Sequence, residues 1–211
     1  EQDKKIATQT AAIQAAEEAM QKKTGEREPA FLAWLAAPTA ETTDLSGSYD
    51  LDAKDKDSFA NTADANRAAK SNDKNKLVPG HRGQALSFTG DDPLSLGNHG
   101  VANREDPFTV AFWLKPGEVS KRSLVFHNSS GYDPGCNGFE LLLEDGKLRW
   151  MVAREWPGNC IAVGTKDTIP VNEWTHVVVS YDGSSKAAGL RVSLNGNAAP
   201  LEIVRDHLTK N

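Results

Sequence analysis

The stretch from residue 172 to residue 196, NEWTHVVVSYDGSSKAAGLRVSLNG, limits the possible folds more than any other part of the sequence. Its first half is an extended run with β-branched residues on both faces, for example Val178 on one and Val177 on the other. Turn residues follow at Asp182-Gly183, and residues 190–194 resume a period of two before the Asn195-Gly196 turn. The pattern predicts a hairpin of a β-sandwich.

Size and charge narrow the classes of function. The 211 residues suffice for a sizeable core, and the formal net charge of −5 is spread without a basic stripe. This distribution argues against a nucleic-acid partner. No apolar run approaches the roughly 20 residues of a membrane-spanning helix. The sequence begins without Met and without a signal-peptide pattern, so we expect a mature chain or a part of a longer one.

The N-terminal residues follow a different pattern. From Lys4 to Lys23 the sequence is rich in Ala with apolar residues at helical spacing, and Thr24-Gly25 provides a stop. A second short helical pattern covers residues 28–35 and ends before Pro38. We therefore expect a helical spacer or docking segment over residues 1–40, followed by the sandwich over residues 41–211.

Two upstream segments extend the pattern of the hairpin: GQALSFTGDDPLSLG at residues 83–97 and DPFTVAFWLKP at residues 106–116. Together with the hairpin they resemble the laminin-G-like, concanavalin-A-like lectin and glucanase domains over residues 45–206. The resemblance implies a mainly β protein, an antiparallel β-sandwich of the jelly-roll type. The segments WPGN at 156–159 and YDGSSKAAGL resemble most the version found in large exported planctomycete proteins that also carry a cytochrome c domain.

The end of the sequence departs from this family. Laminin-G-like domains normally finish with a segment resembling F-x-G-x-I-D-E-V-R-I-Y, whereas this sequence ends at Thr209-Lys210-Asn211. We expect the sandwich to lack its last strands, which a further chain segment would supply.

The two cysteines, Cys136 and Cys160, lie in segments that the resemblance places side by side. An exported chain with an even number of cysteines favours a disulfide, which would stabilise the fold by about 3 kcal/mol. Two buried free thiols are the alternative. The sequence contains no C-x-x-C-H motif, so we expect no haem on this segment.

A polar stretch from Asp50 to Lys76 predicts a loop with at most one short edge strand. Relatives often hold calcium here through a D-x-S-G-N-x-N pattern. The candidate ligands in this sequence are Asp57, Asn61 and Asp64, but Ala60 replaces the glycine. A solvated loop is the alternative to a calcium site.

Carboxylate spacing argues against hydrolysis. Glycosidases of this fold carry an E-x-D-x-E strand, and Leu142 occupies the central Asp position here. Glu140 and Glu144 would lie about 13 Å apart along a strand, whereas glycosidase pairs are about 5 to 9.5 Å apart. We therefore expect no enzymatic activity from this domain.

Aromatic rings next to polar residues indicate where a ligand binds. A pyranose stacks its C–H face on a ring while its hydroxyls bond to planar polar groups. Trp156 could instead belong to a packed loop corner. We predict a ligand site within the segment from His127 to Asn159, formed by His127, Tyr132, Asp133, Trp150, Arg154, Trp156 and Asn159.

The sequence therefore predicts a noncatalytic binding module of a larger exported protein, periplasmic or extracellular, with carbohydrate as the leading ligand. The alternative is a scaffolding domain that docks on other domains or subunits of a cytochrome-c-associated complex. Fold-level analogy alone does not decide between them.

Overall fold

The structure is a computed structural model that describes residues 13–17, 45–71, 74–97, 99, 103–119, 121–130 and 135–210. The chain divides into two units, Glu1–Leu45 and Ser46–Asn211. In the first unit, residues 13–17 are helical, within the helix predicted from Lys4 to Lys23, and the second expected helix lies outside the described residues. Among the described helices, none is long and apolar enough to cross a membrane.

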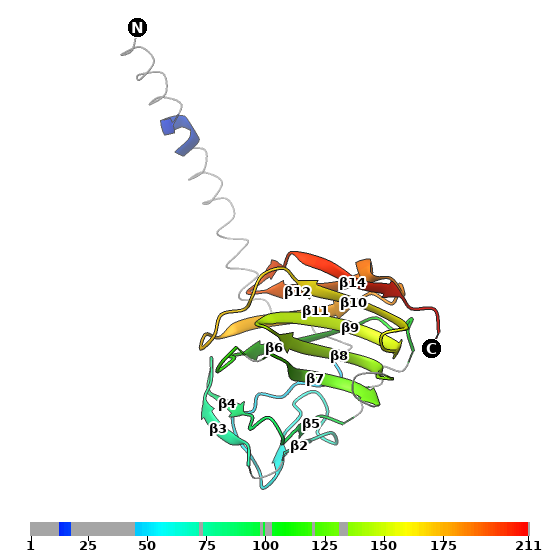
Figure 1. The fold of residues 1–211 in the computed structure, drawn as a ribbon. Coiled ribbons are helices and arrows are strands. Elements are labelled where there is room, and N and C mark those ends of the chain that lie inside the picture. Colours follow the sequence, from blue (N-terminus) through cyan, green and yellow to red (C-terminus); the bar gives the residue numbers. More distant parts are fainter. Residues whose placement is uncertain are drawn as a thin grey trace. The chain divides into compact units, whose positions relative to one another are not determined.

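The second unit is built on two antiparallel sheets, as the sequence predicted (Figure 1). The larger sheet has the strand order β14-β10-β9-β8-β7 and the smaller one has the order β13-β12-β11-β6. The larger sheet consists of β7 (Ser123–Ser130), β8 (Asn137–Glu144), β9 (Lys147–Glu155), β10 (Asn159–Thr165) and β14 (Leu201–His207). The smaller sheet consists of β6 (Phe108–Leu114), β11 (Thr175–Tyr181), β12 (Leu190–Leu194) and β13 (Asn197–Ala198).

The predicted hairpin is confirmed as β11 and β12, which pair from Val177↔Leu194 to Tyr181↔Leu190. Side chains alternate along β11 between buried and half-buried, so one face of the smaller sheet packs inward. A short 3-10 helix, η1 (Ala187–Gly189), lies within the connection. The period of two in the sequence of β11 therefore corresponds to side chains that point in turn into the core and toward the outer face of the sheet.

The core lies between the two sheets and is rich in aromatic rings. Trp150 of β9 is fully buried and packs edge-on against Phe108, with ring centroids 5.7 Å apart. Val177 and Val179 contribute from β11 and Ile161 from β10. Burying one such side chain stabilises the fold by about 1.5–3 kcal/mol. This core fixes the ends of the strands, where the candidate site lies.

A smaller layer precedes the sandwich. It contains a three-stranded sheet, in the order β1-β2-β5, and a two-stranded hairpin, β3-β4. Its strands are β1 (Ser58–Phe59), β2 (Ala69–Ser71), β3 (Lys76–Pro79), β4 (Gln84–Ser87) and β5 (Leu94–Ser95). Phe59, Ala69 and Leu86 form its own small core. The loop predicted over Asp50 to Lys76 is thus wrong in part, because Phe59 and Ala69 provide enough apolar surface to anchor two short strands.

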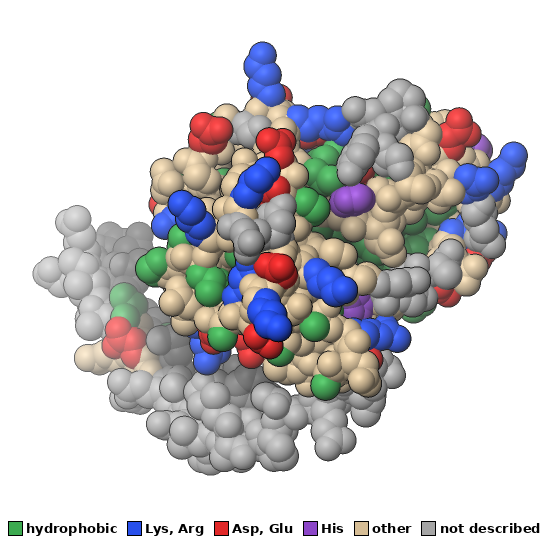
Figure 2. Space-filling model, turned by 90° about the horizontal axis from the view of Figure 1, so that it is seen from below, with side chains coloured by type: hydrophobic (Ala, Val, Ile, Leu, Met, Phe, Trp, Pro, Cys, Tyr) green, Lys and Arg blue, Asp and Glu red, His purple; other side chains and the backbone are tan. Residues whose placement is uncertain are grey.

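Two large aromatic side chains are exposed. Phe88 is 56% exposed, and Trp113, on the outer face of β6, is 41% exposed. His81 stacks on Trp113 with ring centroids 3.5 Å apart and connects the small layer to the sandwich. On the face shown in Figure 2, Lys and Arg side chains are interspersed with Asp and Glu side chains, without a continuous basic stripe.

Candidate functional site

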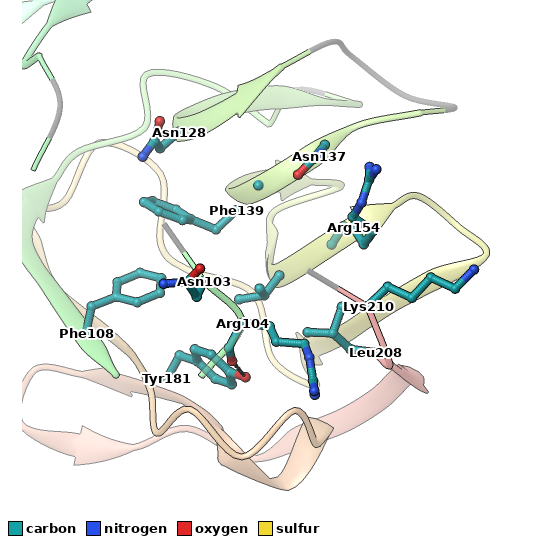
Figure 3. Close-up of a pocket in the computed structure, with 13 residues that line it drawn as sticks. Asn103, Arg104, Phe108, Asn128, Asn137, Phe139, Arg154, Tyr181, Leu208 and Lys210 are labelled. Atoms are coloured by element: carbon teal, nitrogen blue, oxygen red, sulfur yellow. Dashed lines mark hydrogen bonds between the residues drawn. The ribbon is translucent and has the colours of Figure 1, made fainter. Parts of the chain in front are cut away.

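A pocket of about 70 Å³ lies at one end of the sandwich (Figure 3). Its residues come from strand ends that the antiparallel order brings together: the starts of β6 and β8 and the ends of β7, β9 and β11. The lining consists of Asn103, Arg104, Phe108, Asn128, Asn137, Gly138, Phe139, Val152, Ala153, Arg154, Tyr181, Leu208 and Lys210. The pocket therefore depends on the topology and not on any local motif.

The lining combines rings with carboxamides. The rings of Phe108 and Phe139 lie 4.5 Å apart between centroids and form one wall. Asn128 at the end of β7 and Asn137 at the start of β8 contribute amide groups from neighbouring strands. Apolar walls with a few polar groups are typical of ligand sites that fix orientation by hydrogen bonds.

A hydrogen-bond network holds the segment before β6 against the turn after β11. The hydroxyl group of Tyr181 donates to the backbone carbonyl oxygen of Arg104 and accepts from the backbone N–H of Ser185 at 2.9 Å. The Arg104 guanidinium donates to Ser185 Oγ at 2.7 Å and pairs with Glu105 at 2.8 Å. These bonds fix one side of the pocket.

Gly138 allows the close approach of β7 and β8 beside the pocket. Its φ is +131°, and a Cβ atom at this position would lie 2.0 Å from the carbonyl oxygen of Asn128. Only glycine tolerates both the dihedral angle and the contact. The position of the Asn128 backbone at the pocket therefore depends on this residue.

Of the predicted ligand residues, Arg154 lines the pocket. His127 is exposed on β7, where its Nδ1 lies 2.9 Å from Ser129 Oγ. Tyr132 and Asp133 lie outside the described residues. The ligand segment predicted from the sequence thus contributes to the pocket through Arg154 and through Asn128, Asn137 and Phe139, which had not been singled out.

The expectation of an exposed Trp150 is wrong. The side chain is fully buried, and its indole N–H donates to the carbonyl oxygen of Ser180 at 3.1 Å. Its polar neighbour Arg149 lies on the opposite face of β9, because successive strand residues alternate. Trp150 can therefore contribute to the site only through the packing of the core.

Trp156 is half-buried in the connection between β9 and β10, after which a cis peptide bond leads to Pro157. The guanidinium carbons of Arg149 and Arg205 lie 4.7 Å and 5.8 Å from the ring centroid of Trp156. These cation–π contacts engage the ring that was expected to stack on a sugar.

Asn159 holds the C-terminal segment of the described chain. Its Oδ1 accepts from the backbone N–H groups of Thr209 at 3.0 Å and Lys210 at 3.3 Å, and its Nδ2 donates to Thr209 Oγ1 at 2.8 Å. The predicted ligand residue thus has a positioning role, since it places Lys210 at the pocket.

The predicted disulfide is not seen, because Cys136 and Cys160 are buried thiols that are not bonded to each other. They lie in one cluster with Met151, on the face of the larger sheet opposite the core. The Cys136 thiol donates to the Glu140 carboxylate at 3.7 Å and the Cys160 thiol to the carbonyl oxygen of Pro157 at 3.5 Å. Burial raises the pKa of Cys160 above its ordinary value.

The three candidate calcium ligands have other partners. Asn61 is buried, and its Oδ1 accepts from the backbone N–H groups of Ser48 and Ala63 at 2.9 and 3.0 Å. Asp64 pairs with Arg67 at 3.1 Å, and Asp57 lies 3.6 Å from Lys54. Within the described ranges, no group of three or more His, Cys, Asp or Glu residues could hold a metal. Calcium at this loop stays a prediction.

Sequence reasoning missed most of the pocket, including Asn103, Tyr181 and Lys210. These residues are spread over most of the sandwich sequence, and no spacing links them. The signal that could have found them is their place at strand ends, combined with a strand order that only the structure provides.

Two solved structures and one family model are similar to this chain. The binding domain of Paraclostridial Mosquitocidal Protein 1 is similar, with 15% identity and a TM-score of 0.50. The match covers 72% of this chain and 39% of the mosquitocidal protein chain. An S-layer domain-containing protein from Clostridium thermocellum ATCC 27405 is 21% identical, with a TM-score of 0.49 over 74% of this chain and 71% of that chain. Among curated proteins none matches. Residues 88–210, more than half of the chain, match Laminin_G_3, the concanavalin A-like lectin/glucanases superfamily, and the chain therefore belongs to this family.

Proposed function

We propose that this domain is a noncatalytic carbohydrate-binding module of a larger exported protein, and that its binding site is the pocket at the end of the sandwich. The observation that carries the proposal is the meeting of Asn128 and Asn137 with the Phe108 and Phe139 rings in one pocket. Carboxamides offer paired donors and acceptors for vicinal hydroxyls, and rings suit the C–H edge of a pyranose.

The size of the pocket sets the expected affinity. The pocket is small, about 70 Å³, and open to solvent on one side. Most of the ligand then stays in solvent, so few contacts offset the loss of its freedom. We expect dissociation constants from roughly micromolar to millimolar, or about −8 to −4 kcal/mol.

A glycan array followed by titration calorimetry tests this proposal. We expect Asn137→Ala and Asn128→Ala each to weaken binding of the best glycan severalfold, because one or two hydrogen bonds are lost. Asn197→Ala, on an exposed strand that does not line the pocket, is the matched control. If no glycan binds at millimolar concentration, or if the control weakens binding equally, the proposal falls.

A second candidate function is scaffolding, in which the domain docks on another domain or subunit of a larger assembly. The observation that favours it is a set of large apolar side chains that do not line the pocket: Phe88, Trp113 and Leu124 are 56%, 41% and 38% exposed. Exposed apolar side chains mark an interface where they form one contiguous patch. Hydrogen exchange that slows at these residues in the full-length protein, compared with the isolated domain, would support docking.

A further inference from the structure

The described residues that line the pocket carry a net charge opposite to that of the chain. The chain has 29 acidic and 24 basic residues. The described lining residues include Arg104, Arg154 and Lys210 but no Asp or Glu. A local excess of positive charge on an acidic protein favours an anionic ligand, since it attracts the ligand and discriminates against neutral ones.

The three cationic side chains differ in whether they already form an ion pair within the described chain. The Arg104 guanidinium already pairs with Glu105 at 2.8 Å and bonds Ser185 at 2.7 Å. Within the described chain, Arg154 and Lys210 form no ion pair, and both are exposed. Their positive charges are therefore the ones that can interact with a ligand.

Arg154 and Lys210 stand at the mouth of the pocket. In Figure 3 their side chains lie on the side away from Phe108 and extend outward rather than into the cavity. Arg154 belongs to strand β9, and Asn159 holds the Lys210 backbone through a 3.3 Å hydrogen bond. The uncharged floor of the pocket consists of Phe108, Asn128, Asn137 and Phe139. A ligand held by this floor would thus place its neighbouring groups next to the two cations.

We propose that the site recognises acidic glycans, in which a sugar edge occupies the uncharged floor and carboxylates of neighbouring uronic acid units lie against Arg154 and Lys210. The inference rests on the proposed function and specifies its ligand class. Arg binds a carboxylate through two parallel N–H groups, and Lys acts as a point charge. Both charges lie in solvent, so each contributes modestly.

A trigalacturonate and its methyl ester provide a matched pair of probes, because esterification removes the charges and keeps the sugar skeleton. Calorimetry at low salt should show the acid binding about threefold to tenfold more tightly than the ester. Added salt should remove this difference by screening the acid alone. The single variants Arg154→Gln and Lys210→Gln should each reduce this difference, and the double variant should abolish it. Lys147→Gln, at the opposite end of β9, is the control and should preserve the difference.

The outcomes separate the two proposals. Equal affinity for acid and ester overturns the acidic ligand class and leaves carbohydrate binding intact. If neither trimer binds and the array shows no other glycan, both proposals fall. If acetate or sulfate alone displaces the acid at the same concentration as the trimer, the site binds small anions and the glycan part of the inference is wrong.

Discussion

The indole N–H of Trp150, on β9 of the larger sheet, donates a hydrogen bond to the carbonyl oxygen of Ser180, on β11 of the smaller sheet, at 3.1 Å. The bond crosses the interior of the sandwich. It joins a fully buried ring to the backbone next to Tyr181, which lines the pocket. The packing of the two sheets and the geometry of the pocket are thus connected by one side chain.

Trp150→Phe should lower the free energy of unfolding by about 2 kcal/mol, because it removes this hydrogen bond and leaves a cavity. Urea denaturation of both proteins measures the difference. Trp113→Phe, at an outer-face residue that is 41% exposed, is the control and should change stability by less than about 1 kcal/mol. Equal effects of the two substitutions would contradict the assigned role of Trp150.

Gly138→Ala should reduce both stability and ligand binding. An added Cβ atom would lie 2.0 Å from the Asn128 carbonyl oxygen at a φ of +131°, so the β7 backbone must shift at the pocket. We expect the free energy of unfolding to fall by more than about 1 kcal/mol. Gly158→Ala, where a Cβ atom meets nothing within 4 Å, is the matched control. Thermal melting and calorimetry would contradict this account if Gly138→Ala behaved like the control.

The sequence predicted the strands more accurately than their side-chain environments. Alternation in Thr175–Tyr181 identified β11, and the Asp182-Gly183 turn separated it from β12. Trp150 was misassigned because Arg149 beside it was taken to indicate a polar environment, although adjacent strand residues face opposite ways. Cys136 and Cys160 were correctly expected to be neighbours, but proximity does not decide whether a bond forms.

The pocket could not be predicted in the same way. A pattern within one segment describes that strand and its faces. Asn103, Asn137 and Tyr181 meet because strand order and register bring distant segments together, and the sequence of one chain does not encode this order in any local spacing. Arg154 was identified because it is a polar residue close in sequence to the rings of Trp150 and Trp156.

Neither cysteine should react with an alkylating reagent in the native protein at neutral pH. Both thiols are fully buried, and burial raises the pKa of Cys160, which lowers the thiolate fraction. After unfolding without reductant, mass spectrometry should find both thiols modified. A chain that takes up no reagent even when unfolded would reveal a bonded pair and contradict the free thiols.

Stability should decrease at high pH through Tyr49. Burial raises the pKa of its hydroxyl group above the ordinary 10.0. Above pH 10.0 the unfolded chain therefore loses this proton before the folded protein does, and unfolding becomes more favourable as the pH rises. Below that pH the contribution is fully present. Urea denaturation across this range should show a steeper decline for the wild type than for Tyr49→Phe, and parallel curves would rule the effect out.

The order of the strands also has a consequence for how the chain folds. Strands β7 to β10 follow one another as neighbours in the larger sheet, whereas β6 pairs with β11 only after those four strands have intervened in the sequence. Local hairpins close small loops, and distant pairings must first overcome a larger loss of chain entropy. We therefore expect the β7–β10 meander to form early, and the joining of β6 to β11, which brings Phe108 and Tyr181 together at the pocket, to limit the folding rate.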